Sequence, residues 1–178
     1  MFDWLIEDDD LRLRGAAIGL VSDVEDPDGL GRVEVELPWY AGGYREWARV
    51  VHFYGGDKVG STWIPEPGGE VLVVFGHGDL RFPYVLGCLY SPVDRPPESR
   101  TSSSDIRTVR TPSGSEITFD ETKGLVELKT KEGASVRLDE KKGELSLEAT
   151  SKITLKAAEI VIEATSKVTV KGSSIALN

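Results

Sequence analysis

Short runs of hydrophobic residues recur along residues 16–90, and several alternate with polar residues in the two-residue period of a β-strand. The clearest run is Arg32–Leu37; its apolar residues, which would share one face, are Val33, Val35 and Leu37. No segment of this region has the 3.6-residue period of a helix. Turn residues separate five predicted strands, at 16–24, 32–37, 47–53, 70–75 and 84–90. Five such strands predict an all-β fold that begins with an OB-type barrel.

A different pattern begins at Ile117, where two apolar residues separated by one residue recur between polar or turn residues. The pairs are Ile117 and Phe119, Val126 and Leu128, Val136 and Leu138, Leu145 and Leu147, Ile153 and Leu155, Ile160 and Ile162, Val168 and Val170, and Ile175 and Leu177. Successive first members lie 9, 10, 9, 8, 7, 8 and 7 residues apart. This spacing is too short for a helical solenoid repeat and does not match a coiled-coil heptad. It predicts one short strand and one corner per repeat.

Each predicted strand carries too little apolar surface to form a core within one chain. Three copies wound around one axis would solve this problem, because each strand would pair with strands of the other two chains. We therefore predict an intertwined trimeric triple-stranded β-helix of eight levels, about 38 Å long at the usual strand spacing. The residues expected at the trimer axis are Val126, Leu128, Val136, Leu138, Leu145, Leu147, Ile153, Leu155, Ile160, Ile162, Val168, Val170, Ile175 and Leu177. A twisted monomeric sheet and a single-chain β-solenoid stay open as alternatives.

The charge distribution divides the chain near the same place. Residues 1–104 contain 9 Lys and Arg against 18 Asp and Glu, whereas residues 105–178 contain 12 of each kind. The net charge of −9 therefore belongs to the first region. It argues against nucleic-acid binding through a basic surface and against a polybasic membrane anchor. All nine Pro, four Trp and five Tyr also lie at or before residue 112, so the two regions should pack differently.

The N-terminal residues have neither the basic start nor the apolar stretch of a signal peptide, and they become acidic at Glu7. No run reaches the roughly 18 apolar residues of a transmembrane helix. Cys88 is the only cysteine, so no intrachain disulfide can form. We therefore expect a protein made in the cytoplasm. The acidic arm, with Phe2 and Trp4 before the charges, would suit a contact with another protein or would be a frayed terminus.

Candidate chemistry is sparse. His77 and Asp79 could form a base and carboxylate pair, but no nucleophile is placed beside them and the segment also suits a loop. The acidic residues alternate along strands or cluster in turns, unlike the facing carboxylates of a glycosidase. No His or Cys follows Cys88, which we expect to be a small core residue. We expect no catalytic residue, no cofactor and no metal site.

Three segments resemble the phage baseplate assembly protein V and central tail-spike family of contractile injection systems, which includes parts of the T4 spike and of VgrG proteins. These segments are 19–35, 47–50 and 67–90. The resemblance implies an OB-fold barrel followed by a trimeric triple-stranded β-helix. It also implies a needle at the centre of a baseplate, driven through a membrane when a sheath contracts.

Departures from the family pattern shape the expected partners. Only a short segment separates barrel and needle, where the T4 spike carries a lysozyme domain. About 15 residues precede the barrel, where VgrG proteins carry a hub region, so we expect a separate hub protein. The needle lacks a histidine-bearing metal tip, which implies a separate PAAR-type tip protein. Tube and baseplate components and a transient target membrane complete the expected partners, and nucleic acid is not among them.

These observations predict four segments: an N-terminal arm (1–15), an OB-fold barrel (16–93), a linker (94–116) and a β-helix needle (117–178). The predicted function is that of a homotrimeric structural spike, not an enzyme, which links hub to tip and helps puncture a membrane. It would be assembled into a phage tail or tail-like injection particle. The alternative is a trimeric adhesin fibre whose barrel head binds carbohydrate or protein.

Overall fold

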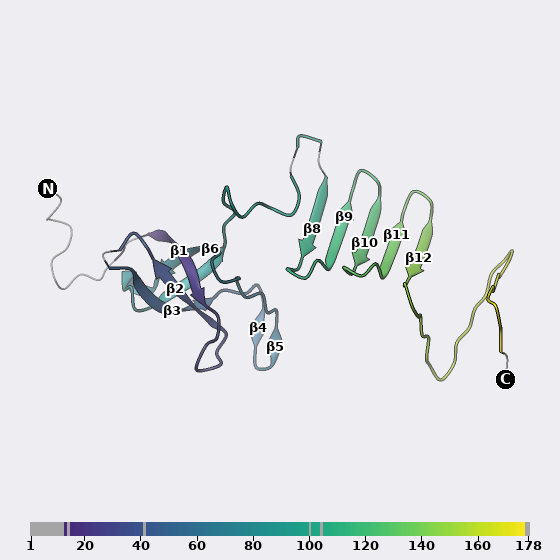
Figure 1. The fold of residues 1–178 in the computed structure, drawn as a ribbon, viewed down its shortest axis with the longest axis horizontal. Coiled ribbons are helices and arrows are strands. Elements are labelled where there is room, and N and C mark those ends of the chain that lie inside the picture. Colours follow the sequence, from purple (N-terminus) through teal and green to yellow (C-terminus); the bar gives the residue numbers. More distant parts are fainter. Residues whose placement is uncertain (1–12, 14, 41, 100, 104, 177–178) are drawn as a thin grey trace. The chain divides into compact units, whose positions relative to one another are not determined.

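The computed structural model describes residues 13, 15–40, 42–99, 101–103 and 105–176. The chain forms two compact units, Met1–Pro96 and Pro97–Asn178. The described residues are almost entirely strands, turns and loops, with one short 3₁₀ helix, η1, at Gly76–Gly78. Figure 1 shows a barrel in the first unit and a row of short strands in the second. No helix within the described ranges is long and apolar enough to cross a membrane.

Five strands close the barrel in the order β1-β2-β3-β7-β6. Neighbouring strands are antiparallel except for β3 and β7, which pair in parallel and complete the closure. The barrel strands are β1 Ala16–Asp23, β2 Arg32–Leu37, β3 Tyr44–Val50, β6 Glu70–Phe75 and β7 Pro83–Cys88. A separate two-stranded hairpin is formed by β4 Gly55–Gly56 and β5 Val59–Gly60. The all-β fold and the OB-like five-strand barrel predicted from the sequence are therefore confirmed.

Alternation along the barrel strands produces its core. In β2 and β6 every second residue is buried, as the two-residue period requires when one face points into the barrel. The buried hydrophobic residues are Val21, Val33, Val35, Leu37, Ala48, Val71, Val73, Phe75, Leu80 and Val85. The strands approach closely at Gly19, where an added Cβ would collide with a methyl group of Val35. A glycine is therefore required at this position of β1.

The second unit contains a five-stranded antiparallel meander in the order β12-β11-β10-β9-β8. Each strand has five residues and pairs with its neighbours in sequence. The strands are β8 Ile106–Arg110, β9 Glu116–Asp120, β10 Leu125–Lys129, β11 Ser135–Asp139 and β12 Glu144–Glu148. Two kinds of turn alternate along the meander. Residues 111–129 and 130–148 therefore have the same order of turn, strand, turn and strand, which repeats after 19 residues.

Two predictions need correction in this unit. The segment predicted as a linker contains β8, which pairs with β9 through its whole length. The prediction that every strand pairs with other chains is wrong for the inner strands β9, β10 and β11. Both edges of each are hydrogen-bonded to strands of the same chain, which leaves no edge for another copy.

Residues 149–176 differ from the meander, because no strand is assigned to them although their apolar pairs continue the pattern. Their hydrophobic side chains are exposed, Ile160 by 51% and Ile162 by 68%. Cys88 is likewise exposed at the end of β7. Its predicted place in the barrel core is wrong.

Candidate assembly surface

The predicted axis residues of the meander form two straight rows on one face of the sheet. Direct cross-strand partners connect Ile117 to Leu128, Leu128 to Val136, and Val136 to Leu147. Val109 of β8 extends this row opposite Ile117. Direct partners in an antiparallel sheet share a face, so one apolar residue from every strand lies in this row.

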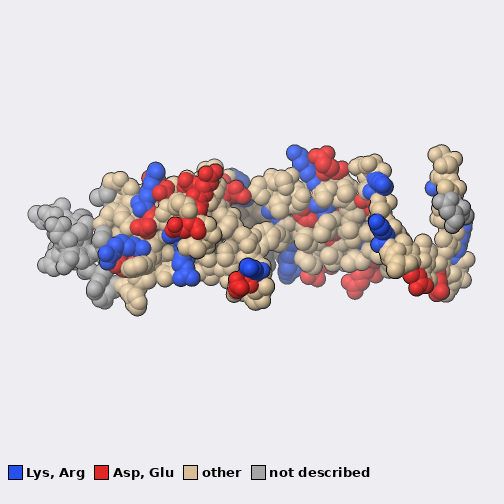
Figure 2. Space-filling view, turned by 90° about the horizontal axis from the view of Figure 1, so that it is seen from below, with Lys and Arg blue, Asp and Glu red and all other residues tan. Residues whose placement is uncertain are grey.

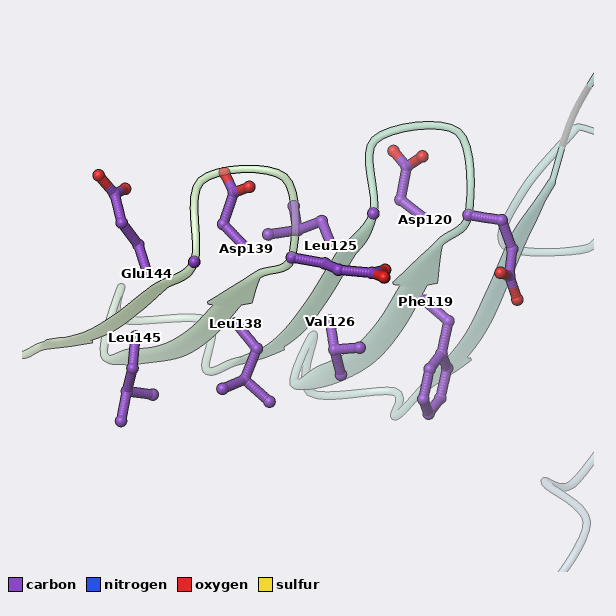
Figure 3. Close-up of a pocket in the computed structure, with 12 residues that line it drawn as sticks. Phe119, Asp120, Leu125, Val126, Leu138, Asp139, Glu144 and Leu145 are labelled. Carbon is purple, nitrogen blue, oxygen red and sulfur yellow. The ribbon is translucent and has the colours of Figure 1, made fainter.

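The second row runs beside the first. It connects Phe119 to Val126, Val126 to Leu138, and Leu138 to Leu145, and it begins at Arg107 of β8. The side chains of its four apolar members lie on one side of the sheet and line an open cavity of about 400 Å³ (Figure 3). The residues predicted for the axis thus share one face of the meander; their place at a trimer axis stays a prediction. The sequence pattern did not identify Val109, because the residue two positions before it is Arg107 and not an apolar residue.

These rows form an exposed surface in the single chain. Most members are well exposed, from 39% at Val136 to 63% at Leu145, and Val126 is half-buried, whereas the hydrophobic core residues of the barrel are at most 8% exposed. The only buried residue of the second unit within the described ranges is Asp120. A contiguous apolar face of this extent marks a site for contact with another molecule.

The opposite face of the same sheet is polar. Glu127 and Arg137 are direct partners there and form an ion pair, with Nη2 and Oε1 2.8 Å apart. Thr108 and Thr118 are also direct partners, and their hydroxyl oxygens lie 3.2 Å apart in a hydrogen bond. Opposite charges and paired hydroxyls favour a strand pairing with one face in water. The sheet is therefore two-sided, with Arg107 on the apolar face and Ile106 and Leu125 on the polar face as the exceptions. Acidic and basic side chains both appear on its surface (Figure 2).

Two equivalent turns carry carboxylates along one edge of the sheet. The backbone N–H of Lys123 donates to Oδ1 of Asp120, and that of Lys142 donates to Oδ1 of Asp139. The side-chain hydrogen bond from Lys123 is the largest effect that lowers the pKa of Asp120. For Asp139 the backbone donation by Lys142 is the largest effect that lowers the pKa. These carboxylates stabilise the turns in their ionised form.

The axis residues predicted beyond Glu148 are placed differently. Ile153, Leu155, Ile160, Ile162, Val168, Val170 and Ile175 lie in the part of the chain without assigned strands. Leu177 lies outside the described residues, as does the acidic arm at 1–12. Among the residues predicted for the axis, only those up to Leu147 therefore share one face of a sheet in this structure.

The catalytic candidates lie in a turn of the barrel. His77 belongs to η1 and has a φ of 56°, a backbone conformation typical of a tight turn. Asp79 follows it, and its Oδ2 lies 2.6 Å from Nη2 of Arg81 in an ion pair. This carboxylate also accepts the backbone N–H of Arg81. Its hydrogen bonds hold the turn between β6 and β7, which accounts for the His-Gly-Asp segment structurally.

Comparison with known proteins identifies the barrel. Residues 17–90 match the profile of the type VI secretion system/phage-baseplate injector OB domain. The chain is 35% identical over 108 residues to the type VI secretion system spike protein VgrG5 of Pseudomonas aeruginosa, a match that covers 54% of this chain and 14% of that protein.

Two proteins of Vibrio cholerae are similar over the same share of the chain. The spike protein VgrG3 and the actin cross-linking toxin VgrG1 are each 30% identical over 107 residues, which is 54% of this chain and 10% of each relative. The matched segment is therefore a small part of these longer proteins. The resemblance inferred from the sequence is confirmed, and it rests on the barrel.

Proposed function

We propose that this chain is a homotrimeric structural spike, because residues 17–90 match the profile of the type VI secretion system/phage-baseplate injector OB domain. The barrel would sit among the proteins of a baseplate, and the second unit would form the needle. Its work would be mechanical, so the proposal assigns no catalytic residue. VgrG5 and VgrG3 are named as spike proteins, which supports this role.

One observation carries the proposal: two apolar rows cross the meander, and most of their members are more than a third exposed. Three copies arranged around an axis would turn these rows inward and close a three-sided prism. Each side would be the meander of one chain, since the inner strands have no free edge. The charged face with Glu127 and Arg137 would point to solvent.

Residues 149–176 would use a different mode of pairing. A hairpin that joined Ile153–Leu155 to Ile160–Ile162 would have Ala157 and Ala158 as a two-residue turn. Such turns require positive φ, which alanine disfavours, whereas the meander turns have Gly124, Gly133 and Gly143 at positive φ. This segment therefore lacks the turn chemistry to fold on itself. Intertwining with two other copies would provide its hydrogen-bond partners, as the β-helix hypothesis requires.

The wider assembly follows from the same proposal. A separate hub protein would hold the barrel, tube and baseplate components would surround it, and a PAAR-type tip would cap the needle. The particle would be a phage tail or a tail-like injector, and contact with the target membrane would be transient. The balanced charges of residues 105–178 support this picture, because an even polar exterior would slide past lipid without adhering.

Native mass spectrometry and light scattering of the purified chain test the trimer. We expect a species of three times 19.4 kDa, stable to dilution. A chain that ends at Glu148 should still associate but dissociate more readily, because the meander faces remain and the intertwined segment is lost. A stable monomer of the full chain would contradict the proposal.

Co-purification distinguishes the spike from the alternative adhesin fibre. Sheath, tube or baseplate proteins recovered with the tagged chain support the spike. Glycan binding by the barrel in the absence of such partners would support the adhesin.

A further inference from the structure

A groove of about 630 Å³ lies on the outer surface of the barrel, away from its core. It is lined from β2, β3 and β7, from the loops that precede β2 and β7, and from the segment that follows β3. Its polar and aromatic lining includes Arg32, Trp47, Arg49, His52, Arg81 and Tyr84. The alternation that buries Val33 and Ala48 turns their strand neighbours outward into this groove. In OB-type barrels, the face of the second and third strands with its flanking loops is a common place for ligands.

The groove concentrates positive charge on a region that is otherwise acidic. Arg32 and Arg49 are direct partners across β2 and β3, an arrangement that repels unless anions accompany it. Arg32 has such anions, since its Nη2 lies 2.7 Å from Asp26 and 2.5 Å from Asp28. Arg49 is exposed and has no ion pair within the part of the chain that the structure describes. It is therefore the cation in the groove whose charge is uncompensated.

Three guanidinium groups lie over aromatic rings beside or within the groove. Arg32 lies 5.7 Å from the centre of the Trp47 ring, and Arg49 lies 5.8 Å from that of Tyr84. Arg81 lies 5.9 Å from the centre of the Phe82 ring. These contacts hold the cations in place and occupy one face of each ring. Flat ligands such as nucleobases or sugars would need those ring faces as stacking surfaces, so the groove is better suited to ligands bound through charge.

The ligand chemistry follows from this arrangement. A fixed guanidinium matches a carboxylate, which it can bind through two parallel hydrogen bonds. A long polyphosphate is disfavoured, because residues 1–104 carry twice as many acidic as basic side chains and Glu46 also lines the groove. Leu30, Val50 and Phe82 add apolar lining beside the cations. The combination fits a short acidic segment that also carries apolar side chains.

We propose that this groove docks an acidic peptide segment of a partner protein, with an Asp or Glu carboxylate of that segment bound to Arg49. Arg81 would provide a second, flanking cation, and the apolar residues of the peptide would pack against Phe82 and Leu30. Arg32, held by Asp26 and Asp28, would orient Trp47 and the loop before β2. This site belongs to the barrel alone and does not depend on the proposed needle.

Fluorescence anisotropy with the full-length chain tests the site. The probe is a fluorescein-labelled octapeptide of alternating Asp and Leu with blocked ends, and the matched control has Asn in place of Asp. We expect the Asp peptide to bind at least about tenfold more tightly than the Asn peptide, with affinity that falls as salt is added.

Two variants locate the carboxylate. Arg49→Gln should weaken binding of the Asp peptide about tenfold, because it removes the charge and keeps most of the exposed side chain. Arg45→Gln is the matched control, since Arg45 lies on the same strand but pairs with Glu36 outside the groove lining. It should leave the affinity unchanged. Tryptophan fluorescence and native mass spectrometry of each variant confirm that the barrel is folded and record its oligomeric state.

Three results would overturn the proposal: equal binding of the Asp and Asn peptides, unchanged binding by Arg49→Gln, or tighter binding of a single-stranded oligothymidylate than of the Asp peptide. The last would assign the groove to nucleic acid. A monomer that still binds the Asp peptide through Arg49 would contradict the trimeric spike and leave the groove proposal intact.

Discussion

The barrel and the second unit treat their hydrophobic residues in opposite ways. Among the described residues, all ten buried hydrophobic side chains lie in the first unit, at positions such as Val33 and Val73 that are inaccessible to solvent. The second unit has equally regular strands and its apolar residues are aligned in rows, yet none of those within the described ranges is buried. A closed barrel surrounds its hydrophobic core with its own strands. A flat meander supplies only one side of a core, so another molecule has to cover its apolar face. The first unit therefore has the features of a self-contained domain, and the second has those of one side of an assembly.

A charge at a residue predicted for the trimer axis in residues 149–176 should have the largest effect on the difference between the two units. Ile160→Asp would place three carboxylates together at one level of the proposed axis, and unpaired buried charges typically cost several kcal/mol each. We expect loss of the trimer in native mass spectrometry. Val161→Asp is the matched control, because alternation directs Val161 to the other face. A trimer in the Ile160 variant, or its loss in both variants, would contradict the assigned face.

A cavity in the barrel should affect only the first unit. Val33→Ala removes two methyl groups from a fully buried site and should lower the free energy of unfolding of the barrel by about 2 kcal/mol. Urea unfolding followed by tryptophan fluorescence measures it, because all four Trp lie in the first unit. Val93→Ala, at a position 88% exposed, should change little. Loss of the trimer in Val33→Ala would show that the barrel, and not the second unit, holds the copies together.

Acid should weaken the barrel through Asp26. The side-chain hydrogen bond from Arg32 holds the pKa of the Asp26 carboxyl well below its ordinary value. A carboxyl whose folded pKa is depressed contributes stability above about pH 4, and this contribution is lost as the pH falls through the folded pKa. Asp26→Asn should therefore lower the urea midpoint at neutral pH, and the difference from the parent chain should shrink at about pH 3. Asp57→Asn, in the β4–β5 turn, serves as the control, and a pH-independent difference would contradict the linkage.

A turn glycine of the meander should give the smallest effect. Gly143 has a φ of 65°, and an added Cβ there would meet no atom within 4 Å, so Gly143→Ala changes only the backbone preference. We expect the stability of the proposed trimer to fall by about 1 kcal/mol, measured as a lower temperature of dissociation. Gly143→Asn should lose less, because asparagine tolerates positive φ better than alanine does. Equal losses in both variants would point to a different role for this turn.

Sequence periodicity predicted the barrel well because each strand has one buried face. Val33, Val35 and Leu37 are buried as their alternation required. In the apolar run of β6, only Val71, Val73 and Phe75 are buried, because the outer face of this strand is not covered by a second layer. Strand ends were less predictable. The third strand was expected at 47–53 and lies at Tyr44–Val50, since its limits depend on pairing with β2 rather than on local pattern.

In the second unit, the spacing of the turn residues predicts how the strands pair better than the apolar pairs alone do. The 19-residue repeat, visible in Thr111 and Thr130, Gly114 and Gly133, Asp120 and Asp139, and Gly124 and Gly143, marks the hairpins that pair within one chain. The later steps of seven or eight residues mark the segment without such turns. The barrel groove was not foreseen, because its three arginines are 17 and 32 residues apart in sequence and meet only through β-sheet pairing and loop packing.

Because the same order of turns and strands repeats, the length of the second unit can change in fixed steps. Each copy of the 19-residue repeat adds two strands, and hence about 9.5 Å along the direction in which strands stack. An even number of strands restores the original chain direction and the same inward face. Duplication or deletion of one copy would therefore change the reach of the structure in fixed increments without disturbing the segments on either side. Duplication of this segment would lengthen the second unit without requiring any new kind of packing.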